Sequence, residues 1–571
     1  MQKAKLKKVK KRQKEERDSL DAISTTAYRI FRGPATSIAK KMPSMREELL
    51  KSNMRLTPEA LISLALFLTM ITGIISAVLV ILALLLRFLY LFMAVVIPPI
   101  VFIVLVMSPK MSQSSRAYAL ENELPYVMGF MQVLAGGGVS PIIALKRISG
   151  MSKVFPAASK EAKRILIDIE VFGKDPITAL TNAARTNPNR DFAEFLYGYA
   201  TILKTGGDVG NYVHIKMREL FDKRNMKLKR SADTIGTLAE SYVTVTSVLG
   251  ISLFMLYEVQ SVISHNQAGL QSIFLFAFVI VPLISAVFIW LLDSMQPKQP
   301  YIDYRPFKAF AVSGVIGAAL FLIPLPLKLY LHVSIALAAM VSYPAILSMK
   351  YARERTSIEN ALPDFIRDVA EGRKIGLSPE MSIEQLVNKG YGLLSSPVRK
   401  MGSQLSWGLS LDKVMKSFVN QVNSWLAKVV GTLMLEVVDA GGGMVQSFSE
   451  LADFTRKVQE FENDLKASLR PYIMVIYMAG LMIVITTFLM VYLMTQPAIS
   501  SYGASSLGGA VSPTVIEELL VATIFESWVV GFVAGKMGSG SLANGFIHAF
   551  ILVIAGALTI ILSGFFIHIP L

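Results

Sequence analysis

Residues with catalytic or metal-binding chemistry are few in this sequence and lie far apart along it. The 571 residues include no cysteine, which removes disulfides, thiol chemistry and cysteine-based metal sites. No His-Glu-x-x-His pair or Gly-x-Ser-x-Gly elbow is present, and none of the histidines has a partner at metal-ligand spacing; they are His214, His265, His332, His548 and His568. We therefore expect no catalytic residue, metal or cofactor, and we expect the chain not to be an enzyme.

The segment 531–536 (Gly-Phe-Val-Ala-Gly-Lys) comes nearest to a phosphate-binding motif. It is one residue short, is followed by Met537 rather than Ser or Thr, and falls at the end of an apolar segment. A phosphate loop needs the full spacing for its backbone N–H groups to surround the phosphates. We reject the motif, so any ATP that drives this protein is hydrolysed by another chain.

Glu526 is the one acidic residue in the middle of a long apolar segment. Ionisable residues inside a membrane span are costly and often functional. Three interpretations stay open: a protonated or hydrogen-bonded packing residue, a coupling-ion site, or a contact with a helix of another subunit. A transporter would show polar, broken helices at matched places in two membrane halves. Here the spans carry few charges, which argues against a transporter but leaves it as an alternative, beside an unrelated membrane scaffold.

The elements that must position these residues include a long internal repeat. The stretch 121–125 (Glu-Asn-Glu-Leu-Pro) returns as 359–363 (Glu-Asn-Ala-Leu-Pro), and 138–141 (Gly-Val-Ser-Pro) returns as 376–379 (Gly-Leu-Ser-Pro), both displaced by 238 positions. Further on, Thr-Gly-Gly at 205–207 matches Ala-Gly-Gly at 440–442, at a displacement of 235. A repeat of this length indicates a duplicated polar module.

Each copy of the module is expected to be a helix bundle. Apolar residues follow helical spacing in the first copy, at Leu124, Val127, Met128, Met131 and Leu134. Glycines at 136–138 and 372–376 then end a helix, and Ser-Pro pairs at 140–141 and 378–379 restart it, with serine as the cap and proline at the first position. The later corners Gly206-Gly207 and Gly441-Gly442 are either simple helix ends or pivots on which a partner pushes.

The remainder of the chain is predicted to lie in a membrane. Mean hydropathy is +0.51 and 53% of the residues are hydrophobic, too apolar for an ordinary soluble protein. A spanning helix needs about 20 mostly apolar residues. We predict nine: 61–86, 88–107, 238–262, 270–292, 309–326, 329–348, 472–494, 515–535 and 545–568. The fifth and sixth form either a tight turn around Pro324, Pro326 and Lys328 or a re-entrant dip.

Charge predicts the orientation of the spans. Residues 1–60 carry 16 Lys and Arg against 7 Asp and Glu, and 108–236 carry 19 against 12. The segments 263–269 and 495–513 hold no Lys or Arg. Because Lys and Arg accumulate on the cytoplasmic side, we place the N-terminus and both modules inside and the C-terminus outside. The net charge of +16 then reflects this bias and attraction to lipid headgroups, not nucleic-acid binding.

The predicted fold class is all-α, a polytopic membrane protein with about nine transmembrane helices and two cytoplasmic helix bundles. In chain order we expect a basic N-terminal arm (1–60), a transmembrane hairpin (61–107), the first module (108–236), four transmembrane helices (237–349), the second module (350–470) and three transmembrane helices (471–571). The charged run at 1–19 is either a solvated arm near the lipid or a docking arm for an acidic partner.

The paired modules and their landmarks resemble the duplicated F-type domain of type II secretion and type IV pilus platforms. The stretch 50–59 resembles the segment ahead of the first hairpin in the archaeal and tight-adherence branches. The layout over 50–490 is most similar to archaellum platforms of the FlaJ/ArlJ type and to archaeal pilus platforms. We favour the archaellum, because the number of spans exceeds the bacterial pattern.

The resemblance implies a membrane platform beneath a growing filament. Its partners would be a hexameric secretion ATPase, pilin- or archaellin-like subunits and membrane lipids, and we expect a homo-oligomer. The glycine corners would be the pivots. Basic residues, otherwise read as positive-inside anchoring, become candidate ATPase contacts: Lys146, Arg147, Lys163, Arg164, Arg218, Lys223, Arg224, Lys227, Lys229 and Arg230.

Overall fold

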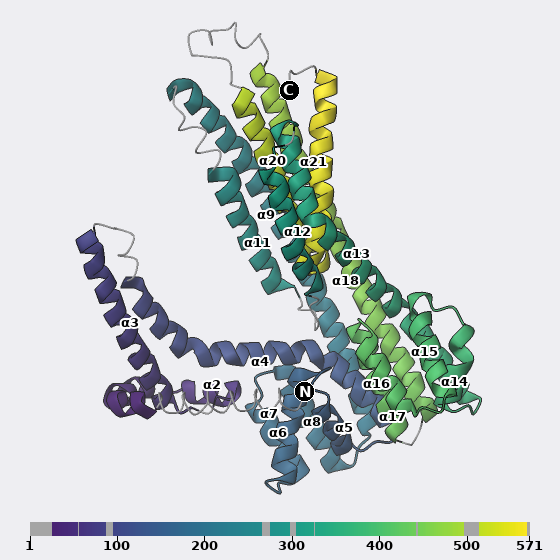
Figure 1. Cartoon of the computed structure of the whole chain (residues 1–571). Helices are drawn as coiled ribbons and strands as arrows, with labels where there is room; N and C mark the ends of the chain where they lie inside the picture. The colour runs from purple at the N-terminus through teal and green to yellow at the C-terminus, as the bar shows by residue number, and fades with distance from the viewer. Residues whose placement is uncertain are drawn as a thin grey trace. The chain divides into compact units, whose positions relative to one another are not determined.

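The computed structural model describes residues 25–54, 56–86, 95–264, 275–296, 304–324, 326–440, 444–495 and 513–567. Every regular element in these ranges is a helix, as predicted (Figure 1). The chain divides into two compact units. The first comprises Met1–Met131 and Ser140–Lys216, and the second comprises Gln132–Val139 and Met217–Leu571.

The first unit holds two long helices with apolar segments and most of the first polar module. Its helices are α2 (Met45–Ser52), α3 (Pro58–Leu86), α4 (Ile97–Gly136), α5 (Pro141–Gly150), α6 (Pro156–Glu170), α7 (Pro176–Thr186), α8 (Arg190–Thr205) and the first turns of α9 (Val209–Ser264). Inside the module the ring of Phe195 stacks on Tyr199 and on Tyr212, with centroids 5.3 and 5.8 Å apart. These aromatic contacts hold α8 against the start of α9.

The second unit holds the second module and most of the apolar helices. After the π-helical turn η2 (Phe276–Ile280), its elements are α11 (Val281–Met295), α12 (Arg305–Leu322), α13 (Leu329–Lys374), α14 (Pro379–Gln385), η3 (Leu386–Asn388), η4 (Gly392–Leu394), α15 (Ser395–Ser406), α16 (Leu411–Gln421), α17 (Trp425–Ala440), α18 (Met444–Thr495), α20 (Pro513–Ser539), η6 (Leu542–Asn544) and α21 (Gly545–Ile567). Helices α12 and α13 pack against each other, with the ring of His332 2.7 Å from Leu320 O.

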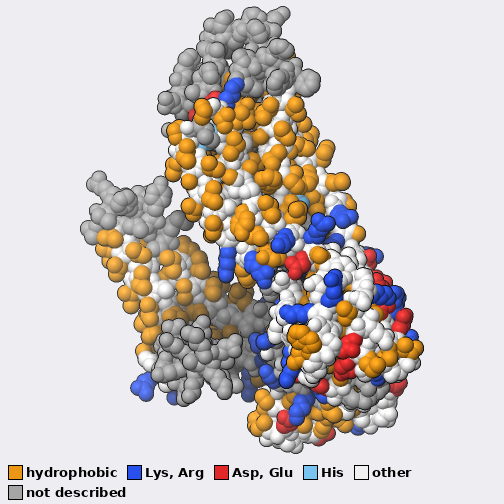
Figure 2. Space-filling view, turned by 45° about the vertical axis from the view of Figure 1, so that its right-hand side comes forward, with side chains coloured by type: hydrophobic (Ala, Val, Ile, Leu, Met, Phe, Trp, Pro, Cys, Tyr) orange, Lys and Arg blue, Asp and Glu red, His pale blue; other side chains and the backbone are white. Residues whose placement is uncertain are grey.

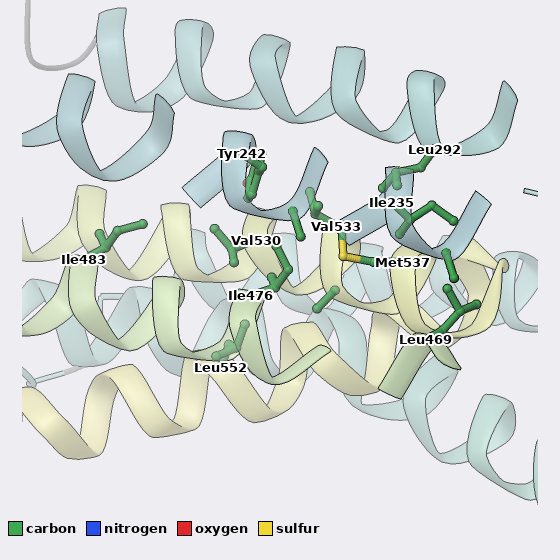
Figure 3. Close-up of a cluster of buried hydrophobic side chains, with 13 residues drawn as sticks. Ile235, Tyr242, Leu292, Leu469, Ile476, Ile483, Val530, Val533, Met537 and Leu552 are labelled. Carbon is green, nitrogen blue, oxygen red and sulfur yellow. The ribbon is translucent and has the colours of Figure 1, made fainter. Parts of the chain in front are cut away.

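A buried apolar cluster joins the long helices of the second unit (Figure 3). It brings together Ile235 and Tyr242 of α9, Leu292 of α11, Leu469, Ile476 and Ile483 of α18, Val530, Val533 and Met537 of α20, and Leu552 of α21. Between such helices the hydrophobic effect is weak in lipid, so close van der Waals packing holds them. The outer sides of the same stack carry exposed apolar side chains, seen as the orange surface in Figure 2.

The order of helices confirms the duplication inferred from the sequence. Helices α5, α6, α7 and α8 correspond in sequence to α14, α15, α16 and α17, and each set lies between two long helices. Gly138 and Gly376 both adopt left-handed backbone, with φ of 75° and 90°, where a side chain would be strained. Pro141 and Pro379 both begin a helix, but only the Ser378 side chain caps it, accepting from Met381 N at 3.2 Å. The Ser140 side chain makes no such bond.

Eight helices in the described ranges are long and apolar enough to cross a membrane. The predicted span 238–262 is not among them and forms the C-terminal part of α9. The predicted limits 107/108 and 349/350 fall inside the unbroken helices α4 and α13. Pro125 and Pro363, at the start of each module in sequence, lie inside these helices as well. Each module is therefore continuous with an apolar helix.

Candidate functional site

Four of the predicted basic contacts lie in the first unit, on α5 and α6. Lys146 Nζ is 3.0 Å from Glu170 Oε1, and Arg164 Nη1 is 3.1 Å from Glu161 Oε1. Lys163 points to solvent on the exposed face of α6, and Arg147 lies in the last turn of α5. Burial lowers the pKa of Arg164, while the neighbouring Glu161 opposes that shift. Lys163 is therefore more available to a partner than Arg164.

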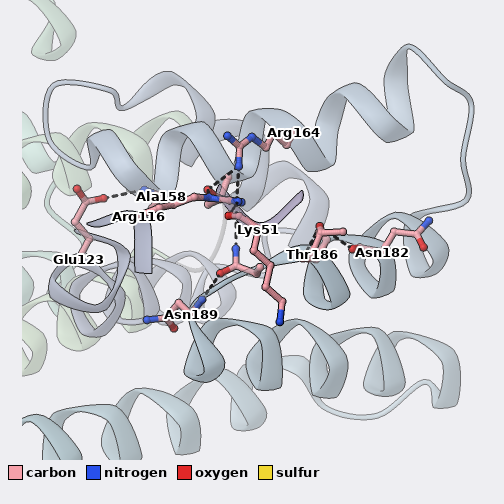
Figure 4. Close-up of polar contacts among 11 residues, drawn as sticks. Lys51, Arg116, Glu123, Ala158, Arg164, Asn182, Thr186 and Asn189 are labelled. Atoms are coloured by element: carbon pink, nitrogen blue, oxygen red, sulfur yellow. Dashed lines mark hydrogen bonds and ion pairs between the residues drawn. The ribbon is translucent and has the colours of Figure 1, made fainter. Parts of the chain in front are cut away.

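Arg164 belongs to an internal network of the first module (Figure 4). Arg116 binds Glu161 through two nitrogens, at 2.9 and 2.6 Å, and donates to Lys51 O at 2.5 Å. Asn187 donates to the same carboxylate at 3.2 Å. Since Glu161 is 6% exposed, its charge needs these partners. The network fixes α4, α6 and the α7–α8 connection to one another.

The other six predicted contacts lie on α9 in the second unit. Leu220, Phe221 and Leu228 are buried, and the Phe221 ring lies 6.5 Å from Phe454 and 6.4 Å from Phe461 of α18. The opposite face is exposed and carries Arg218, Lys223, Lys227, Lys229 and Arg230, with Glu219 and Asp222 among them. Arg224 is the exception, half-buried with its guanidinium 5.3 Å from the Phe461 ring centroid. The predicted set is thus divided between two units, and five of the six residues on α9 share an exposed face that is mainly basic.

The first predicted pivot is an ordered helix end. Gly206 has φ of 72° and follows α8, while Gly207 N donates to Ile202 O at 3.1 Å. Asp208 Oδ1 then accepts from Asn211 N at 3.0 Å, near the start of α9. This is the hydrogen bonding expected of a glycine C-cap followed by a capped helix. Gly441 and Gly442 lie outside the described residues.

Beside α13 the second module has a polar cleft that the sequence did not reveal. Its volume is about 950 Å³, and its lining includes Arg353, Asp364, Arg367, Asn544 and His548. Within the same lining, Asp368 accepts a 2.5 Å hydrogen bond from the Tyr391 hydroxyl and pairs with Lys389 at 2.7 Å. Burial, and secondarily the bond to Asp368, raise the pKa of Tyr391, so its phenol stays protonated as the donor. The cleft lies between the second module and the start of α21.

The ends of α11 and α20 are tied together by a second feature missed in the sequence. Lys536 Nζ is 2.6 Å from Asp293 Oδ1 and 2.9 Å from Gly540 O, and Gln296 Nε2 donates to Lys536 O and Met537 O at 3.0 Å each. The Lys536 side chain is only 7% exposed. The lysine of the rejected phosphate motif is therefore a buried packing residue.

The glycines of that same motif allow α20 and α21 to pack closely. An added Cβ at Gly531 would lie 2.2 Å from Ala549 Cα, and one at Gly535 would lie 2.2 Å from Gly545 Cα. The spacing Gly-x-x-x-Gly is the pattern by which membrane helices approach one another. The Gly-x-x-x-Gly pattern of residues 531–535 therefore indicates a close contact between two helices, although it does not fit a phosphate loop.

Glu526 lies one turn before these glycines and is 3% exposed. Its Oε1 atom is buried without a hydrogen-bond partner. Nearby on α20, Thr523 donates to Thr487 of α18 at 3.1 Å. The structure places Glu526 inside the helix stack of the second unit.

Comparison with known proteins identifies the modules. The family model of type II secretion system (T2SS) protein F matches twice, at residues 129–257 and 365–492. An uncharacterized protein of Methanocaldococcus jannaschii is 22% identical over 496 residues, which cover 80% of this chain and 82% of that protein. The flagella accessory protein J of the same organism is 20% identical over 361 residues, which cover 59% of this chain and 63% of that protein. No solved structure matches the chain significantly.

The two matched regions include the long helices as well as the modules. The first match, 129–257, runs from the end of α4 far into α9, and the second, 365–492, runs from α13 to the end of α18. The apolar helices make the chain a multi-pass protein of the cytoplasmic membrane. The chain thus carries the T2SS protein F domain in two copies, and these domains, with the similarity to flagella accessory protein J, support a membrane platform of the T2SS protein F and FlaJ type.

Proposed function

We propose that this platform couples a hexameric secretion ATPase in the cytoplasm to the assembly of pilin-like subunits, acting as a homo-oligomer and without hydrolysing ATP itself. The observation that carries the proposal is the continuity of the long helices. Helix α13 has 46 residues and α18 has 52, so they extend about 70 and 80 Å along their axes. Each runs from the second module into the apolar stack. A displacement of the module is then transmitted to the membrane part without an intervening loop.

The proposed orientation follows from the distribution of charge. With both modules and the N-terminus in the cytoplasm, the basic face of α9 meets the ATPase, and the C-terminus lies outside. The face comprises Arg218, Lys223, Lys227, Lys229 and Arg230 of the second unit, and Lys163 is a separate exposed basic residue of the first unit. An electrostatic contact of this kind speeds association and weakens with added salt.

The test of coupling interrupts a long helix without removing any contact residue. Ala467 is an exposed residue of α18, and Ala467→Pro removes a backbone hydrogen bond at that point. We expect the full chain in nanodiscs to bind the ATPase normally, while filaments are no longer assembled in cells. Ala467→Ser is the matched control and should behave as wild type. Normal filaments with Ala467→Pro would refute the proposal that α18 transmits movement of the second module to the membrane part.

The test of the partner uses the basic face of α9. Replacing Lys227, Lys229 and Arg230 together by Gln should weaken ATPase binding at low salt and flatten its salt dependence. The control replaces Lys413, Lys416 and Lys457, which lie on the second module. Equal binding by both triple variants, or no binding by the wild-type chain, would remove the ATPase from the proposal.

A further inference from the structure

A second cavity lies beside α13, where this helix passes from the apolar stack into the second module. Its volume is about 660 Å³. The inner wall consists of the buried side chains Ile358, Met401, Phe418 and Val422, which are at most 5% exposed. It is therefore an apolar cavity in an otherwise polar module, larger than a free phosphate or a single water could fill.

The rim of this cavity is basic. Lys350, Arg353 and Lys400 line it, with Glu354 as the acidic residue of the set. All three basic residues are exposed, and Lys400 donates to Gln421 Oε1 at 2.8 Å. An apolar wall under a cluster of Lys and Arg is complementary to a molecule with a hydrocarbon chain and a negative head.

The cavity lies at the level where a bilayer would end. Ile346 and Met349, which also line it, are 61% and 56% exposed and belong to the last turns of the apolar segment of α13. Arg305, at the start of α12, lies 4.9 Å over the Tyr351 ring and donates to Asn423 Oδ1 at 3.2 Å. These contacts put the end of α16 and residues 350–353 of α13 beside the end of a second apolar helix. Figure 2 shows Lys and Arg gathered where the orange stack meets the mixed surface of the module.

We propose that this cavity binds one anionic phospholipid of the adjoining leaflet. The phosphate-containing head would lie among Lys350, Arg353 and Lys400, and an acyl or isoprenoid chain would extend over Met401 and Phe418 toward Ile346. A basic pocket between helices at the membrane surface is a known way to hold such lipids. The bound lipid would fasten the second module to the membrane beside α13. This site goes beyond the coupling function and does not depend on the ATPase.

The experiment measures lipid binding to the full chain by native mass spectrometry. Phosphatidylglycerol is titrated into the detergent-solubilised protein, with phosphatidylcholine and inorganic phosphate as separate arms. We expect Lys350→Gln with Arg353→Gln to weaken phosphatidylglycerol binding about 25-fold, since each charge near a membrane surface contributes about fivefold. The control is Lys374→Gln with Lys413→Gln, which removes two positive charges at exposed positions that do not line the cavity. This pair should leave phosphatidylglycerol binding unchanged.

A charge-preserving exchange separates recognition from damage to the fold. Lys350→Arg with Arg353→Lys should bind within about twofold of wild type, because both charges remain. Melting in phosphatidylcholine should be the same for all variants, since both side chains are exposed. Equal binding of phosphatidylcholine, competition by inorganic phosphate, or equal loss in the control pair would each overturn the proposal.

Discussion

Gly531→Ala tests whether the close contact of α20 and α21 stabilises the apolar stack. The new Cβ would lie 2.2 Å from Ala549 Cα and 2.4 Å from Ala549 N. Both neighbours are backbone atoms, which cannot rotate away. A normal carbon contact needs about 3.5 Å, so the helices must separate locally by roughly 1 Å.

That separation sets the expected magnitude. A gap of about 1 Å forfeits up to about half of the dispersion energy between the facing atoms, and overpacking typically costs about 1–3 kcal/mol. The contact involves backbone along two helical turns, since Gly535 approaches Gly545 equally closely, so we take about 3 kcal/mol. Alanine is about 1 kcal/mol more favourable than glycine inside a helix, and this preference offsets part of the overpacking cost. We expect a net loss of about 2 kcal/mol in the free energy of unfolding.

The assay is unfolding in mixed micelles of increasing sodium dodecyl sulfate, followed by tryptophan fluorescence. Trp528 is a local probe, because it lies on α20 with its ring 4.9 Å from Phe532. Gly314→Ala on α12 is the matched control, since a Cβ there has no atom within 4 Å. It should be neutral or slightly stabilising. If Gly531→Ala were as stable as Gly314→Ala, the close-packing argument would be wrong.

Three further predictions concern the ion pair, the polar cleft and the topology. Asp293→Asn should destabilise the stack by about 3 kcal/mol, more than Lys536→Met, because only the first leaves a buried charge without its partner; equal losses in unfolding would contradict this. Tyr391→Phe should cost about 1–2 kcal/mol at neutral pH by removing the donor to Asp368. Folding raises the pKa of Tyr391 above its ordinary value of 10.0, so the contribution of its hydroxyl to folding stability is present below pH 10 and is lost progressively above it. The difference in thermal stability between wild type and Tyr391→Phe should therefore shrink above pH 10. A difference that stays constant with pH would refute the assignment. Since the chain lacks cysteine, Lys413→Cys and Ser505→Cys give unique labels: an impermeant maleimide should label only Ser505→Cys in intact cells, and the reverse pattern would invert the topology.

The repeat, and the residues that end and begin its helices, could be predicted from local chemistry. Left-handed glycine at 138 and 376, helix starts at Pro141 and Pro379, and the all-helical modules depend on backbone preferences of a few neighbouring residues. The apolar segments likewise depend on composition over one helix length. Eight of the nine predicted spans correspond to helices with the required length and hydropathy in the described ranges.

The candidate sites depended on contacts that no short stretch of sequence contains. The cleft and the cavity beside α13 draw residues from α13, α15, α16 and α21, segments up to about 200 positions apart. The sequence pattern makes Arg164 and Lys163 equal candidates, whereas packing half-buries Arg164 beside Glu161 and leaves Lys163 exposed.

Sequence alone determined the duplicated helical modules, the membrane segments and the family resemblance, because helix periodicity, glycine conformation and hydropathy are local properties. Only the tertiary structure decided that Lys536 is a buried partner of Asp293, that Gly531 and Gly535 face a neighbouring backbone, and that Lys350 and Arg353 border an apolar cavity. These roles arise when helices distant in the chain pack together, and burial then determines which charges are paired and which face a partner.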